Sequence, residues 1–177
     1  KDTVNYSRIL AIIEKLLEAP LPRDITYVVD YEQAMIKALL EKGLKVEGCF
    51  FHFMQAVERQ CGKLGLKTRL ETDRAFRHRV YSLTSLAFLP PDEIARAYDR
   101  LAPFFEMVER PLLDYFEETW VGKMAASGLR VNAFFPPFIW SVNARLNKGL
   151  DMTTNANERF HCVLRKMLLH LHPMLAD

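Results

Sequence analysis

Glycine and cysteine are both scarce in this sequence, and each scarcity excludes a class of protein. The chain has 7 glycines and no glycine-rich phosphate loop, which argues against a small-molecule α/β enzyme that binds a nucleotide. The three cysteines, Cys49, Cys61 and Cys162, are an odd number in a chain of this length, so a disulfide framework is not expected. We therefore expect a reducing compartment, either the nucleus or another intracellular location.

Long hydrophobic runs and an excess of one charge are also missing. The longest apolar stretches, such as Ala133 to Trp140, are far shorter than the roughly 18 to 20 residues that span a bilayer, so no membrane partner is expected. Lys and Arg number 24 against 22 Asp and Glu, for a formal net charge of +2. A polyanionic partner would therefore have to bind a local patch of positive charge.

The composition is that of one folded domain. The chain has 177 residues, of which 50% are hydrophobic and 26% charged, and both fractions are near the average for globular proteins. This length is enough to bury a continuous core. The composition excludes a disordered or low-complexity chain.

The amino-terminal part has the pattern of an α/β protein. Apolar residues at helical spacing over Ile9–Leu17 predict an amphipathic helix that stops before Pro20. The β-branched and aromatic runs Ile25–Val29 and Val46–Phe51 predict two buried strands, and Tyr31–Lys42 predicts a helix between them. Strand, helix and strand fit within about 30 residues, the size of a βαβ unit with parallel strands.

After His52 the pattern is mostly helical. Breaks are expected at Pro90-Pro91 and Pro136-Pro137, and a long loop over Gly122–Pro137. The helices expected are Met54–Leu64, Thr72–Leu89, Asp92–Leu101, Phe104–Trp120 and Asn155–Leu171. Because two parallel strands do not form a stable sheet alone and parallel sheets are covered on both faces, we expect further strands upstream of Lys1.

Asp30 is the first candidate for chemistry. It follows the first expected strand directly, and open α/β sheets bind their ligands at the carboxyl ends of their strands. The alternative is structural, since Asp30 with Gln33 three residues on fits a capping box for the next helix.

Cys49 and His52 form a C-x-x-H motif at the end of the second expected strand. This motif supplies two ligands, whereas a structural zinc site needs four. In a strand the two side chains would face opposite sides, so joint metal binding would need a bend or a helix start at His52. The alternative is a buried cysteine and a histidine bonded to the backbone.

The segment Thr153–His161 holds the third candidate, at the start of the last expected helix. Asn155 suits an N-cap and Glu158 falls at the third helical position, so a capping box is one interpretation. The other is chemical: Glu158 and His161 are three residues apart, which puts them on one helix face.

A run of basic residues is the fourth feature, diluted by Glu71 and Asp73. Such a face could neutralise several phosphates, although a solvated helix surface is the commoner explanation of such a run. The run consists of Lys63, Lys67, Arg69, Arg74, Arg77, His78 and Arg79.

Three of these segments, in this order, resemble the Mutator-like (MULE) transposase domain: Val28–Ala34, Gly48–Phe53 and Thr153–His161. That family shows a strand ending in an acidic residue, a C-x-x-H strand end, and much later a helix start similar to T-N-N-x-x-E-x-x-H. Trp140 resembles a tryptophan that is common ahead of the final motif. The sequence departs from the family in having Thr154-Asn155 for two asparagines and Trp140-Ser141 for Trp-Asn.

The resemblance implies an α/β protein with a partial RNase H-like fold. Residues 1–52 would form the carboxyl-terminal part of the sheet region, including the βαβ portion. Residues 53–150 would be a large helical insertion, and residues 151–177 would contain the last catalytic helix of the core.

The resemblance also implies a DDE-type transposase that cuts and rejoins DNA with Mg²⁺ or Mn²⁺. Asp30 matches the second carboxylate of the metal-binding set and Glu158 the third, while the first would lie upstream of the printed residues. Cys49, His52 and His161 would be accessory residues. The partners implied are DNA and further copies of the same chain.

Two alternatives of other classes stay open. One is a domesticated, transposase-derived protein that binds DNA or regulatory partners without cutting. The other is a structural zinc module built from Cys49, His52, His161 and Cys162.

Overall fold

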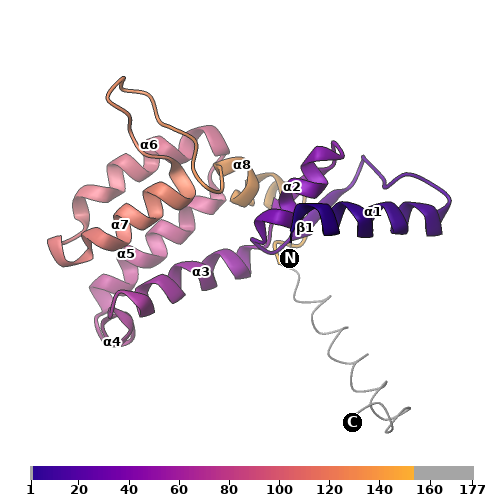
Figure 1. Ribbon diagram of the computed structural model, residues 1–177. Coiled ribbons are helices and arrows are strands. Elements are labelled where there is room, and N and C mark those ends of the chain that lie inside the picture. The colour runs from indigo at the N-terminus through magenta and orange to yellow at the C-terminus, as the bar shows by residue number, and fades with distance from the viewer. Residues whose placement is uncertain (1, 154–177) are drawn as a thin grey trace, which may run out of the picture.

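The computed structural model describes residues 2–153 and begins with a helix and a βαβ unit (Figure 1). The elements are α1 (Thr3–Leu17), β1 (Thr26–Val29), α2 (Gln33–Glu41) and β2 (Lys45–Gly48). The two strands pair in parallel, with Thr26 opposite Lys45 and Val29 opposite Gly48. The expected βαβ unit and the α/β class are thus confirmed.

The second strand ends earlier than the sequence pattern predicts. It stops at Gly48, and Phe50 and Phe51, which read as strand residues, begin helix α3 (Phe50–Lys63). Cys49 has extended backbone angles and its carbonyl accepts a 3.0 Å bond from the Phe53 N–H, so it closes the first turn of α3. The prediction of a strand through Phe51 is wrong for this reason.

A helical part follows, in which Pro and Asp residues divide the chain into shorter helices than expected. The prediction of one helix over Phe104–Trp120 is wrong, because the backbone at Phe105 is extended and helical structure resumes only after it. The helices are α4 (Lys67–Thr72), α5 (Arg74–Ser85), α6 (Pro91–Leu101) and α7 (Arg110–Phe116); the shorter turns are η1 (Leu86–Phe88), η2 (Ala102–Phe104), η3 (Met107–Glu109) and η4 (Glu117–Val121).

Helix α4 and the start of α5 differ from the pattern for a local reason. The sequence predicts a helix starting at Thr72, but the Asp73 side chain accepts a 3.0 Å hydrogen bond from the Phe76 N–H and caps α5 there.

The loop expected over Gly122–Pro137 is confirmed, with one antiparallel bridge between Met124 and Arg130. Two short helices, α8 (Pro137–Trp140) and α9 (Asn143–Asn147), follow it.

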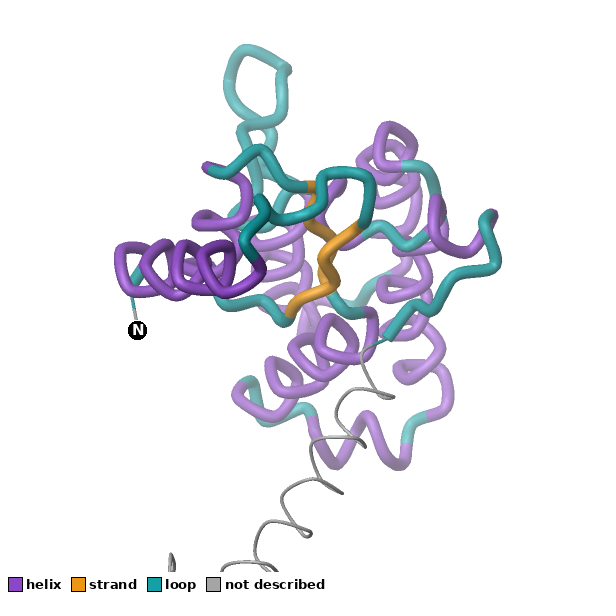
Figure 2. The backbone as a smooth tube through the Cα atoms, turned by 90° about the vertical axis from the view of Figure 1, so that its right-hand side faces the viewer, coloured by secondary structure: helices purple, strands orange, loops and turns teal. Residues whose placement is uncertain are grey.

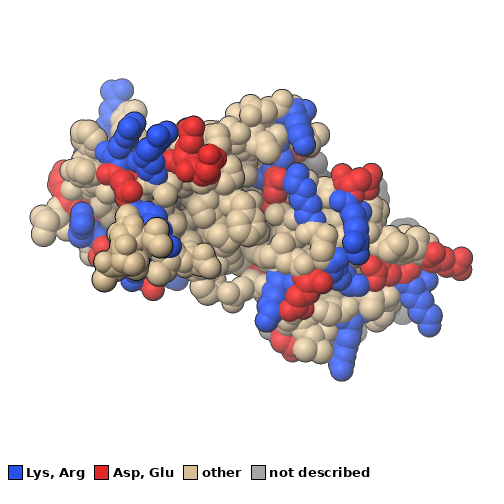
Figure 3. All heavy atoms as spheres, turned by 90° about the horizontal axis from the view of Figure 1, so that it is seen from above, with Lys and Arg blue, Asp and Glu red and all other residues tan. Residues whose placement is uncertain are grey.

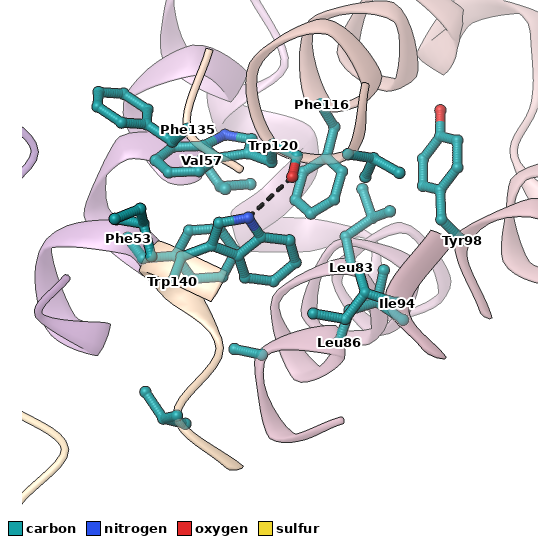
Figure 4. Close-up of a cluster of buried hydrophobic side chains, with 14 of the residues drawn as sticks. Phe53, Val57, Leu83, Leu86, Ile94, Tyr98, Phe116, Trp120, Phe135 and Trp140 are labelled. Carbon is teal, nitrogen blue, oxygen red and sulfur yellow. Dashed lines mark hydrogen bonds between the residues drawn. The ribbon is translucent and has the colours of Figure 1, made fainter. Parts of the chain in front are cut away.

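An aromatic cluster lies in the core of the helical part (Figure 4). Phe53 of α3 stacks on Trp140 of α8 with ring centroids 4.8 Å apart, and it meets the edge of Trp120 at the same distance. The Trp140 indole N–H donates a 2.8 Å bond to the Trp120 carbonyl. Trp140, which the family resemblance singled out, is therefore a fully buried core residue.

The long loop is held against the helices by Arg130. Its guanidinium pairs with Asp99 of α6 and lies 2.7 Å from Glu117 of η4. It also covers the ring of Tyr98, with 5.5 Å between the guanidinium carbon and the ring centroid. The loop is thus fixed at its middle by a cation between two helical elements.

The βαβ unit is open on one side (Figure 2). Among residues 2–153, β1 pairs with β2 alone. Helix α1 packs against α2, yet its apolar side chains Ile9, Ile12, Ile13, Leu16 and Leu17 are exposed. Among the described residues, β1 therefore has one strand edge without a partner strand, and α1 has an exposed apolar face.

The expected boundary between residues 52 and 53 lies inside α3, so this one helix leads from the sheet into the helical part (Figure 1). In the part of the chain that the structure describes, no helix combines the length and the apolar character needed to cross a bilayer.

Candidate functional site

Asp30 lies at the carboxyl end of β1, as predicted. Its side chain is exposed, and one oxygen accepts a 3.3 Å hydrogen bond from the Glu32 N–H. The alternative capping box with Gln33 is wrong, because α2 begins at Gln33 and its N-cap residue is Glu32. The Asp30 carboxylate therefore closes a local turn and is otherwise open to solvent.

Tyr31 fixes the backbone on which Asp30 sits. Its ring packs edge-on against Trp120 at 4.9 Å and against Phe135 at 5.1 Å. The ring also lies so close to Gly48 that a Cβ atom there would overlap it. Burial raises the pKa of Tyr31 well above its ordinary value, and the nearby Cys49 raises it further.

Cys49 lies beside the end of β1. Its N–H donates a 2.8 Å bond to the Val29 carbonyl, one residue before Asp30. The opposite orientation expected in a strand does not apply, because a helix starts here, with Cys49 as the N-cap of α3 and His52 in its first turn. Residues three apart in a helical turn share one face, although Cys49 is fully buried and His52 only partly so.

Arg145 binds the end of β2 to the segment that follows α9. Its side chain is buried, its Nε lies 2.7 Å from Glu47 Oε2, and its Nη2 donates a 2.7 Å bond to the Gly48 carbonyl. The Nη1 group donates a 3.3 Å bond to the Asp151 carbonyl. Sequence reasoning missed this pair, for which the signal was a charged residue, Glu47, within an apolar strand.

Met152 extends this connection to α3. Its carbonyl accepts a 3.0 Å hydrogen bond from the Phe50 N–H, which is one of the unpaired donors at a helix start. The Met152 backbone is thus bonded to the residue that follows Cys49, at the edge of the sheet where Asp30 lies. The chain enters the Thr153–His161 motif from this place.

Glu158, His161 and Cys162 lie outside the described residues. The catalytic role of Glu158, the accessory role of His161 and the zinc module that includes His161 and Cys162 therefore stay predictions. Among residues 2–153, no group of three His, Cys, Asp or Glu side chains is arranged to hold a metal ion. An exposed carboxylate such as Asp30 is a hard oxygen donor that suits Mg²⁺ or Mn²⁺. Asp30 therefore fits as one ligand of such an ion, and the other ligands would come from outside the described residues.

Five of the seven residues of the basic run fall into two groups with different surroundings. Arg79 bonds the fully buried carboxylate of Glu109 with a 2.9 Å contact from Nε, and Arg69 Nη2 lies 3.1 Å from the same carboxylate. These two arginines therefore belong to an internal ion-pair network. Lys63, Lys67 and Arg77 instead line a groove between α3, α4 and α5.

Comparisons of the chain with protein-family models, with curated proteins and with solved structures each find no match.

Proposed function

We propose that the chain is part of a carboxylate-dependent DNA transposase core of the MULE type, with Asp30 and Glu158 as metal-binding catalytic residues. The observation that carries the proposal is the 3.0 Å hydrogen bond between Phe50 N–H and the Met152 carbonyl. This bond holds Met152, the residue directly before the last motif, near the carboxyl ends of β1 and β2.

The reach of the chain agrees with this proposal. Glu158 is six residues beyond Met152, and six residues span at most about 20 Å when extended. Glu158 can therefore reach the edge of the sheet where Asp30 lies. Arg145 supports the arrangement, since it bonds both Gly48 and Asp151 and so holds the approach to the motif against β2.

The open side of β1 supports an RNase H-like sheet with more strands. A strand edge offers a row of backbone donors and acceptors that pair with another strand. The exposed apolar side of α1 would then be covered by the added layer. In the proposed fold, that strand would carry the first carboxylate of the set.

The chemistry would be in-line displacement at a DNA phosphate. Bound divalent ions would stabilise the attacking and the leaving oxygen of this reaction. Asp30, at the end of β1, would be a carboxylate ligand of a bound ion, while Tyr31 keeps the backbone in place through its aromatic contacts. His52 lies at the same edge and could bond a phosphate or a water molecule there.

A DNA-nicking assay with Mg²⁺ or Mn²⁺ tests the proposal, carried out on the natural full-length protein. Asp30→Asn and Glu158→Gln should each abolish nicking, with the free energy of unfolding unchanged. The matched control is Asp24→Asn, since Asp24 is an exposed aspartate at the opposite end of β1. It should leave nicking intact.

The assay separates the proposal from its alternatives. An Asp30→Asn protein that still nicks DNA at the parental rate ends the catalytic assignment. A folded parent that binds DNA without nicking it would favour the domesticated DNA-binding protein. Copurification of one zinc per chain, lost on mutation of Cys49, would favour the zinc module.

A further inference from the structure

The groove between α3, α4 and α5 is lined by cations from three helices. Its volume is about 750 Å³, and its basic residues are Arg59, Lys63, Lys67 and Arg77. None of them forms an ion pair within 4.0 Å with a carboxylate of the described residues. This separates them from Arg69 and Arg79, whose charges are neutralised by Glu106 and Glu109.

The cations come from successive elements that border the groove. Arg59 and Lys63 are one turn apart on α3, and Lys67 is the first residue of α4. Arg77 reaches the groove from α5, where its Nη1 donates a 3.0 Å bond to the Glu71 carbonyl at the end of α4. Several positive charges distributed along one groove suit a ligand with repeated negative charges.

Other groups in the groove fit contact with a phosphate backbone. Gln55 and the half-exposed Tyr81 add neutral hydrogen-bonding groups, which commonly contact DNA phosphates. Two carboxylates, Glu58 and Glu71, also line the groove, so four cations face two anions there. By contrast, on the face seen from above in Figure 3, Lys and Arg are interspersed with Asp and Glu.

We propose that this groove binds the phosphate backbone of double-stranded DNA, away from the carboxylate site. The choice of DNA as the polyanion rests on the proposed function, whereas the groove itself lies wholly within the described helices. Binding would be independent of base sequence, because lysine and arginine contacts to phosphate carry no sequence information.

The test is a fluorescence anisotropy titration of a labelled DNA duplex with the 177-residue chain, at several salt concentrations. Neutralising two exposed phosphate contacts with Lys63→Gln and Lys67→Gln should weaken binding by about tenfold or more and lower the salt slope by about 2. The matched control is Arg96→Gln with Arg100→Gln, which removes two exposed cations of α6 on the other side of the helical part (Figure 1). It should change the dissociation constant by less than about twofold.

A second variant gives a signal of opposite sign. Removing the groove carboxylates with Glu58→Gln and Glu71→Gln should tighten DNA binding and leave the thermal unfolding midpoint unchanged. Equal DNA affinity for the parent and the Lys63/Lys67 variant would overturn the proposal, as would absence of binding by the parent or tighter binding to an RNA duplex. If the full-length protein bound DNA through the groove but did not nick it, only the proposed transposase function would be contradicted. If it nicked DNA equally well with the groove variants, only the proposed role of the groove would be contradicted.

Discussion

Arg145 Nε lies 2.7 Å from Glu47 Oε2, and both side chains are almost completely buried. The same guanidinium bonds the carbonyls of Gly48 and Asp151, so the charge of Glu47 holds a cation that fixes two separate backbone segments. This relationship links the end of β2 to the approach to the last motif.

Replacing Arg145 with methionine should destabilise the fold strongly. Among the described residues, the change leaves the buried Glu47 carboxylate with Lys45, 3.7 Å away, as its one remaining cation, and breaking a buried pair in this way costs about 3 to 5 kcal/mol. Urea unfolding followed by circular dichroism measures the loss. The double variant Glu47→Leu with Arg145→Met should regain a large part of it, because no unpaired charge remains.

The comparison variant is Arg96→Met, which removes an exposed arginine of α6. Surface changes of this kind usually alter stability by less than about 0.5 kcal/mol. If Arg145→Met and Arg96→Met had the same small effect, the buried pair would not hold the two segments together.

Gly48 and Tyr31 should be coupled in stability. A methyl group at Gly48 overlaps the Tyr31 ring, which Trp120 and Phe135 hold in place. Gly48→Ala should therefore cost about 1 to 3 kcal/mol, the usual range for overpacking a core. In a Tyr31→Leu background the same change should cost markedly less, and additive effects in the double-mutant cycle would contradict the contact.

The local elements were predictable from the sequence wherever local residues decide them. The β-branched run ending at Val29 and the helix ending before Gly43 confirm this for β1 and α2. The start of α3 was not, because Phe50 and Phe51 read equally well as strand. A bond from Phe50 to Met152, about a hundred residues away in sequence, accompanies the helix start there, and no local pattern contains that information.

The candidate site shows the same division. The position of Asp30 at the end of a strand follows from local pattern, and the structure confirms that position. The pairing of Arg145 with Glu47 depends on tertiary contacts, so periodicity could not reveal it. Likewise Arg69 and Arg79 look like solvated or phosphate-binding cations in sequence, but their tertiary partner is the buried Glu109. The catalytic roles of Asp30 and Glu158 stay predictions.

Glu109 should be essential for the packing of α5 against η3. Its fully buried carboxylate bonds Arg79 and also accepts a 3.0 Å hydrogen bond from the Glu106 N–H. Glu109→Gln keeps the shape but removes the charge that pairs with the arginines, and we expect a loss of about 2 to 3 kcal/mol in urea unfolding. Glu93→Gln, an exposed glutamate of α6, is the matched control and should be neutral. If Glu109→Gln left the free energy of unfolding unchanged, the ion-pair network around Glu109 would add nothing to the net stability.

Alkaline pH should destabilise the protein through buried tyrosines. Burial raises the pKa of Tyr31, Tyr98 and Tyr115 in the folded state, whereas the unfolded chain has ordinary tyrosines with a pKa of about 10. Since the folded state binds these protons more tightly, their contribution is complete below about pH 10 and is lost as the pH rises toward the folded pKa values. Unfolding free energies across this range, measured together with tyrosinate absorbance, should therefore fall above about pH 10.

Tyr31→Phe should reduce this fall, because it removes one of the titrating hydroxyls. The change should cost little stability at neutral pH, since the Tyr31 hydroxyl is buried with no hydrogen-bond partner among the described residues. Tyr98→Phe should also reduce the fall, but at the cost of the 3.1 Å hydrogen bond to the Leu113 carbonyl. An alkaline fall that is equally steep in the parent and in Tyr31→Phe would show that Tyr31 does not contribute to it.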